Sequence, residues 1–311
     1  MRKGQIIFVI LVLLISDLAH GQAKRNRYKY ELCLNLGATE FLGELGGANQ
    51  VGTHFVKDLN FSMTRPVGGL GLRYRPTSRF ATKADFFIAR VNGDDKLTSE
   101  PFRHNRNLNF RSNIFELSVR GEFYITKESQ GHLYRIKNVK GMQHKDIQAY
   151  LFGGVGGFYF NPKGEYTNGQ WYALRPLGTE GQGLPGGPKE YSLVSVCIPA
   201  GVGMKYGIDQ KWSIGLEYGA RYTFTDYIDD VSGKYYNNAA ILHARGPIAA
   251  YFADPSIHSY PPDPNGTIPA GLHQTAAGNQ RGDPKHTDAY MFMTVNVNYK
   301  IPYSRRTRSK F

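Results

Sequence analysis

Long hydrophobic runs are absent from this chain beyond residues 1–21. No later segment offers the roughly 18 consecutive apolar residues that a membrane-spanning helix needs, and the mean hydropathy is only −0.42. Cysteine is almost absent too. Cys33 and Cys197 could pair in an oxidising compartment, but two cysteines without CxxC spacing are weak evidence for a disulfide or a thiolate metal site. These absences exclude a helical membrane protein and a disulfide-rich scaffold.

Motifs for catalysis and cofactor binding are also missing. The nine histidines are scattered without HxxxH or HExxH spacing. The glycine-rich stretches 153–157 and 178–187 contain no GxxxxGKS or GxxxxGKT phosphate loop. A hydrolase at the rim of a membrane protein would need a gathered nucleophile, base and acid, and no such set is visible. We therefore predict no enzyme, no catalytic or metal residues and no cofactor.

The first residues predict export. Arg2 and Lys3 precede an almost wholly apolar segment, 5–15, and Ala19-His20-Gly21 offers small residues at a cleavage site. This pattern is typical of a cleaved signal peptide, here 1–21. The net charge of +13 suits nucleic acid, anionic lipid or acidic protein surfaces. Export removes nucleic acid from these partners and leaves outer-membrane lipids and periplasmic proteins.

Period-two alternation is the main structural signal in residues 22–303. Within 28–36, Tyr28, Tyr30, Leu32 and further apolar residues alternate with charged, polar or small ones, as expected for a strand with one apolar face. The strand-like segments are 28–36, 65–76, 81–92, 113–125, 148–160, 192–206, 212–224 and 289–301. Eight such segments predict an all-β fold, an eight-stranded antiparallel transmembrane β-barrel of the cell outer membrane. A soluble β domain is the alternative, but its strands are usually shorter.

The polar face of these segments carries interleaved charges of both signs. They are Glu31, Arg73, Arg75, Lys83, Asp85, Glu116, Arg120, Glu122, Glu217 and Arg221. The interior of a small barrel is only wide enough for side chains, so enclosed charges must pair. We predict that these residues form a charge network in the lumen. Glu217 and Arg221 resemble a catalytic pair, but pairing across the lumen explains them without chemistry.

The connections alternate in length. Residues 76–80 and 207–211 are tight turns, whereas 38–64, 93–111, 161–190 and 225–288 are long. Short turns face the periplasm and long loops face outward in such barrels. Within the last loop, 235–253 predicts a helix that ends near Pro247 and Pro255, and 255–288 is too rich in Pro, Gly and Asn for regular structure.

One connection, 126–147, departs from this rule because it is long on the periplasmic side, and it is basic. A basic tail, 304–311, follows on that side. We predict partner-binding residues in these segments: Lys127, Arg135, Lys137, Lys140, Lys145, Arg305, Arg306 and Arg308. A tolerated insertion is the alternative for 126–147.

Three carboxylates, Asp226, Asp229 and Asp230, follow the seventh predicted strand. Carboxylates so close together can bind a cation. More often they form a solvated rim or cap a turn, and we adopt that interpretation.

Several blocks of the chain resemble the PorG family. They are YKYELCLNLGATEFLGELGG, KDLNFSMTRPVGGLGLRYR, YLFGGVGGFYFNPKG, WYALRPLGTEGQG and LEYGARYTFTDYIDDVSGKYY. The run 177–183, LGTEGQG, is the most distinctive, whereas 255–288 and the tail match nothing specific to the family. The resemblance implies an accessory outer-membrane component of the type IX secretion and gliding machinery of Bacteroidetes, associated with the periplasmic ring of the lipoprotein PorK and its partner PorN.

Two functions follow as hypotheses. In the first, a non-enzymatic barrel anchors or positions the periplasmic ring, and basic residues steer its docking. In the second, a small barrel serves adhesion or transport through outer loops that bind a ligand or partner.

Overall fold

The computed structural model describes residues 28–45, 63–98, 100–126, 147–209, 211–257 and 275–302. The predicted signal peptide 1–21 and the eight basic residues predicted to bind a partner lie outside the described residues.

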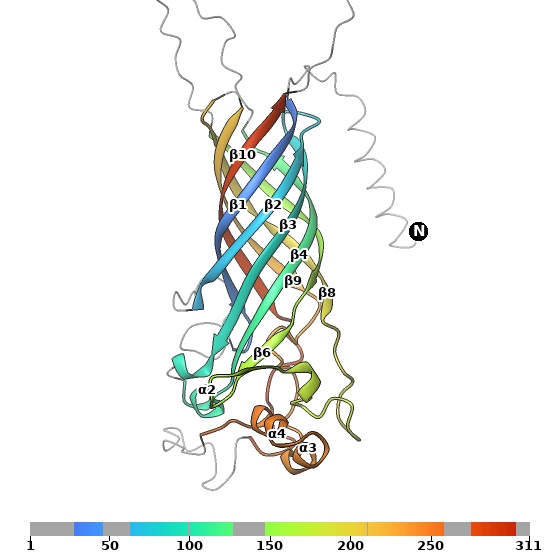
Figure 1. The fold of residues 1–311 in the computed structure, drawn as a ribbon. Coiled ribbons are helices and arrows are strands. Elements are labelled where there is room, and N and C mark those ends of the chain that lie inside the picture. The colour runs from blue at the N-terminus through green and yellow to red at the C-terminus, as the bar shows by residue number, and fades with distance from the viewer. Residues whose placement is uncertain are drawn as a thin grey trace, which may run out of the picture.

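Eight long strands form one closed antiparallel barrel (Figure 1). They are β1 (Tyr28–Leu42), β2 (Arg65–Tyr74), β3 (Phe80–Asp94), β4 (Asn109–Tyr124), β5 (Ile147–Tyr159), β8 (Val194–Gly207), β9 (Trp212–Thr223) and β10 (Ala289–Pro302). Each strand pairs with its neighbour along the chain, and β1 pairs with β10 to close the barrel. The predicted fold class, an eight-stranded transmembrane barrel, is confirmed.

The outer surface of the barrel is a continuous apolar belt. In β1, Leu34 lies between Leu70 of β2 and Val297 of β10, and all three face outward. The next residue, Asn35, points inward and is fully buried. Aliphatic side chains that would be costly to expose to water cover the barrel, while the interior is polar. This arrangement suits hydrocarbon outside and excludes the soluble β domain.

The two ends of the barrel differ. At the turn end, β2 and β3 are joined by 75–79 and β8 and β9 by 208–211. Aromatic pairs surround this end, such as Tyr30 with Tyr74 and Trp212 with Tyr299, as in an interfacial girdle. The opposite end carries a folded cap (Figure 1). By the general rule for such barrels, the turn end faces the periplasm and the cap faces outward.

Several strands continue beyond the apolar belt toward the cap, and their polarity inverts there. Along β3, Lys83 and Asp85 point inward, but the next inward residue is Phe87, and the outward face changes from Ile88 to Arg90. The inward residues at the cap end of the strands form an aromatic core together with Phe41, Phe110, Phe158 and Phe292. The strands β1, β3 and β4 therefore extend into predicted loops 38–64 and 93–111. Those loop boundaries were wrong because the apolar face crosses from outside to inside.

The cap consists of short elements from three loops. They are η3 (Asp95–Leu97), α2 (Pro101–Arg106), β6 (Pro162–Glu165), β7 (Trp171–Ala173), η4 (Arg175–Leu177), α3 (Asn238–Arg245) and α4 (Pro247–Ala253). β6 pairs with the start of β4 and β7 with β6, so the sheet continues into the cap. The predicted helix 235–253 is two helices, because Gly246 and Pro247 interrupt it.

Among the described helices, none has the length and apolar character needed to cross a membrane.

Candidate functional site: a sealed lumen beneath a carboxylate-rich cap

Arg73 is at the centre of the lumen network. Its side chain is completely buried and contacts three carboxylates: Glu122 at 2.7 Å, Glu31 at 2.9 Å and Glu217 at 3.5 Å. These acids lie on three different strands. A guanidinium is suited to this role because its planar donors satisfy several acceptors at once.

Glu217 is the matching anionic centre. It accepts hydrogen bonds from Tyr150 at 2.6 Å and from Lys83 at 3.4 Å, and it pairs with Arg120. Lys83 and Arg120 also both contact Asp85, at 3.1 and 2.9 Å. The positive and negative groups thus form one connected set across the barrel, as buried charges require.

The rest of the network extends toward both ends. Arg221 pairs with Glu116 at 3.2 Å. Arg221 and Glu217 therefore have different ion-pair partners. Arg75 donates to Gln148 and lies over the ring of Tyr124. All ten charged residues predicted for the lumen lie inside the barrel and are at most 3 % exposed.

Sequence reasoning missed some members of this interior set. Lys205 contacts both oxygens of Glu31 at 3.0 Å, and Asn35 accepts from Lys83 at 3.2 Å. The alternation contained the signal for Lys205, since Met204 and Tyr206 on either side of it face outward. The inward position of Tyr150 was not predicted, because the glycines of β5 leave no clear alternation between an apolar and a polar face. The side chains together fill the cross-section of the barrel.

Cys33 and Cys197 are both buried and free. They lie on β1 and β8, which are not neighbours in the barrel. No disulfide therefore joins them.

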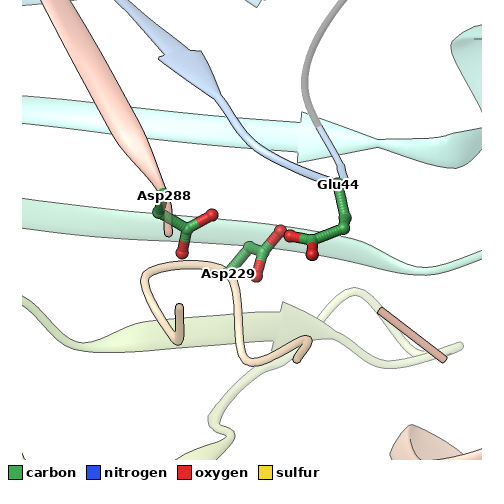
Figure 2. Close-up of side chains that lie close together, drawn as sticks. All are labelled: Glu44, Asp229 and Asp288. Atoms are coloured by element: carbon green, nitrogen blue, oxygen red, sulfur yellow. The ribbon is translucent and has the colours of Figure 1, made fainter. Parts of the chain in front are cut away.

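A second cluster, entirely acidic, lies where the barrel meets the cap. It consists of Glu44, Asp229 and Asp288, and one carboxylate oxygen from each lies within 4.8 Å of the others. Glu44 follows β1, Asp288 precedes β10, and Asp229 belongs to the loop after β9 (Figure 2). Segments far apart in the sequence thus bring three carboxylates to one point.

Backbone amides hold the three carboxylates in place. Asp229 accepts from the amides of Val231 at 3.0 Å and Leu45 at 3.3 Å. Asp288 accepts from the amide of Ile228 at 2.8 Å through Oδ2. Glu44 accepts from the amide of Asp283 at 2.9 Å through Oε1. The carboxylates are therefore positioned by the main chain of the loops they join.

The electrostatics of this cluster are unfavourable for three free carboxylates. Burial, and then the charges of neighbouring carboxylates, raise the pKa of Asp229 and of Asp288 well above its usual range. Burial likewise raises the pKa of nearby Asp226 to about 8. Arg106 donates to the main-chain oxygen of Glu44 at 3.2 Å, and its guanidinium forms an ion pair with Asp95 at 2.8 Å. Among the described residues, no ion pair neutralises the cluster.

The expectation that Asp226, Asp229 and Asp230 form a solvated rim was wrong, because all three are buried. The alternative of a turn cap fits Asp229, which accepts from the amide of Val231. The three aspartates also make different contacts. Asp229 joins the acidic cluster, whereas Asp230 accepts hydrogen bonds from Thr179 and Tyr191, both at 2.6 Å. Burial raises the pKa of Asp230 to about 6. Sequence reasoning missed Glu44 and Asp288, since only folding brings them to Asp229.

The distinctive run 177–183 forms a clasp within the cap. Glu180 is buried, accepts from the amide of Ser232 at 2.9 Å and pairs with Arg281 at 3.0 Å. Gly181 has φ +75°, and a Cβ there would lie 2.4 Å from the ring of Tyr236. The clasp connects the loop after β5 to both ends of the loop between β9 and β10.

Residues 186–243 match the family model described as "Domain of unknown function (DUF6089)", a span that includes β8, β9 and part of α3. No significant match was found among curated proteins.

Several solved structures are similar to this chain. Ail, the attachment invasion locus protein of Yersinia pestis, has 7% identity and a TM-score of 0.37, with 88% of this chain and 99% of that chain covered. Neisserial surface protein A has 7% identity and a TM-score of 0.36, with 88% and 96% covered. OprG from Pseudomonas aeruginosa has 10% identity and a TM-score of 0.31, with 89% and 98% covered.

Proposed function

We propose that this chain is a sealed, non-enzymatic outer-membrane barrel that anchors or positions the periplasmic ring of a protein secretion apparatus, of the type IX kind with a PorK/PorN-type ring. The sequence blocks that resemble the PorG family support this proposal. The filled lumen supports it as well, because a barrel closed by its own side chains acts through its surfaces rather than through a pore.

The observation that carries the proposal is the position of the strand ends. β4 ends at Tyr124 and β5 begins at Ile147, both at the turn end, so the basic segment 126–147 is attached to this rim. β10 ends at Pro302 at the same rim, where the basic tail begins. Two positively charged segments that are both joined to strand ends at this rim would attract an acidic periplasmic surface and accelerate its docking.

The test is a pull-down of the tagged full-length protein from outer membranes in mild detergent. Mass spectrometry identifies the proteins that co-purify. We expect the wild type to recover the ring lipoprotein and its partner. Replacing Lys137, Lys140, Arg305 and Arg306 by Gln should reduce that recovery, most clearly at low salt, because raised salt screens the same charges in the wild type.

A matched control neutralises the same number of charges at the other end. Lys96, Lys189, Lys234 and Lys285 are exposed lysines of the cap. Their replacement by Gln should leave recovery of the ring unchanged. Equal recovery from both quadruple variants would argue against docking through the basic segments.

The folded cap favours a second candidate function, in which the outer loops bind a ligand or partner. The cap has a hydrophobic core of its own, with Ile241, Ala249 and Ala253 fully or almost fully buried. Loops positioned on a rigid scaffold often carry binding functions. Recovery of the barrel alone, under conditions that keep the ring intact, would favour this function.

A further inference from the structure

We propose that Glu44, Asp229 and Asp288 form a binding site for a hard divalent cation, Ca²⁺ in particular. The ion would link the cap to the seam of the barrel, where β1 pairs with β10. This site is independent of the proposed function, since it lies at the opposite end of the barrel from the basic segments.

The geometry of the cluster meets the first requirement of such a site. Ca²⁺ binds carboxylate oxygens at about 2.3–2.6 Å, so two ligands on opposite sides of the ion are about 5 Å apart. The three oxygens lie within 4.8 Å of one another, which allows all three to contact one ion. Figure 2 shows the three carboxylates converging from separate segments.

Buried oxygens without partners point to a ligand. Asp288 is 1 % exposed, and its carboxylate points toward Asp229 (Figure 2). Its Oδ1 has no hydrogen-bond partner among the described residues, and the same is true of Oε2 of Glu44. Buried polar atoms normally find partners. A cation supplies the missing partner to both oxygens at once.

The surrounding charges agree with a cation. Asp226 is a fourth buried carboxylate close to the cluster, and the nearby Arg106 and Arg281 are paired with Asp95 and Glu180. Charge of one sign buried without compensation is very costly. A divalent ion would convert this repulsion into attraction.

The chemistry of the ligands selects the class of ion. All three ligands are carboxylates, with neither histidine nor cysteine among them. Oxygen-only sites suit Ca²⁺, Mg²⁺ or Mn²⁺, whereas Zn²⁺ sites are usually built from imidazole or thiolate. Mg²⁺ requires near-octahedral geometry and retains several waters. A buried site formed by irregular loops therefore favours Ca²⁺.

The position of the site gives the ion a structural role. Leu42 of β1 pairs with Ala289 of β10 at the cap end of the seam that closes the barrel. Glu44 and Asp288 extend directly from these two strand ends, and Asp229 comes from the loop that carries the cap helices. An ion held by all three would tie the cap to the seam.

The test uses the full-length protein, refolded in detergent and freed of metal with EDTA. Calorimetry with Ca²⁺ should show one site per chain, with a Kd of about 10⁻⁴–10⁻³ M or tighter, the range of extracellular calcium modules. Mg²⁺ should bind more weakly. Absence of binding, or a preference for Zn²⁺ over Ca²⁺, would overturn the assignment.

The double variant Asp229→Asn, Asp288→Asn preserves shape and removes two charges. It should weaken Ca²⁺ binding by at least about 100-fold, as expected when ligands themselves are lost. Glu190→Gln, which removes an exposed cap carboxylate that pairs with Arg175, should bind Ca²⁺ like the wild type. Unweakened binding by the double variant would contradict the proposed ligands.

A stability measurement separates a cation from carboxylates that simply share protons. In EDTA, the double variant should resist proteolysis of the cap better than the wild type, because repulsion is relieved. In millimolar Ca²⁺, this order should reverse. If the double variant is the more resistant one in both conditions, the carboxylates share protons and the proposal is wrong.

Discussion

At the scale of single residues, Glu217 shows why the lumen behaves as one unit. Its carboxylate contacts Arg73, Lys83, Arg120 and Tyr150, which come from four different strands. The three cations among these partners each contact a further carboxylate as well. Removal of one member of such a buried set leaves charges without compensation, and that is far more costly than the loss of a single surface pair.

The first prediction concerns this carboxylate. Glu217→Gln should lower the free energy of unfolding by about 3–5 kcal/mol, the usual cost of breaking a buried ion pair. Denaturant titration of the refolded barrel measures it. Glu165→Gln, at an exposed cap position, should change it by less than about 0.5 kcal/mol.

A compensating variant tests the cause of that loss. Lys83 contacts the same carboxylate at 3.4 Å, so adding Lys83→Met to Glu217→Gln removes one positive charge that the loss of Glu217 leaves in excess. The double variant should be more stable than the sum of the single effects predicts. Strictly additive losses would show that the two side chains act independently.

At the scale of elements, the strands were predictable and the cap was not. Alternation identified seven barrel strands clearly because period two places one face in lipid, and it assigned Glu31 and Arg221 to the inner face. It identified β5 less distinctly. The same rule misplaced the cap ends of β1 and β3, where the apolar residues move inside. Glu44 and Asp288 are 244 positions apart in the chain, and no local sequence pattern predicts that they lie close together.

The apolar belt gives the second prediction. Leu117 is 64 % exposed near the middle of β4, where it faces hydrocarbon. Leu117→Arg should destabilise the inserted barrel by about 2–4 kcal/mol, the cost of arginine near the bilayer midplane. Reversible unfolding in lipid vesicles measures this change.

Leu242 provides the matched control, because it is 49 % exposed on α3 in the cap. Leu242→Arg should leave insertion and stability nearly unchanged, since water already surrounds this side chain. Comparable losses from both substitutions would contradict the position of the belt.

The clasp gives the third prediction. Gly181→Ala combines a positive φ with a Cβ placed 2.4 Å from Tyr236, so the cap loops must shift. At Gly186, φ is also +77° but nothing lies within 4 Å of the added Cβ, so Gly186→Ala costs only about 1 kcal/mol of backbone strain. We expect faster proteolysis of the cap in the Gly181 variant than in the Gly186 variant, while the barrel strands stay protected in both.

At the scale of the whole molecule, lipid outside and ion pairs inside make the barrel a rigid stem between two different ends. Its cap has an aromatic core continuous with the cap end of the lumen, whereas the turn end bears short connections and the attachment points of the basic segments. Each end can therefore carry a separate function. We expect the barrel to keep its two ends at a fixed separation and not to conduct ions.

The last prediction follows from that stem. Arg73, Lys83, Arg120 and Glu217 are at most 3 % exposed and occupy the lumen together, so the described residues leave no continuous path of water for ions to follow. The purified protein should give no steady conductance in planar bilayers, and vesicles containing it should not swell in small sugars. A sixteen-stranded porin, which leaves an aqueous channel, serves as the positive control. Steady single-channel steps from the wild type would mean that the lumen opens, and they would favour transport over anchoring.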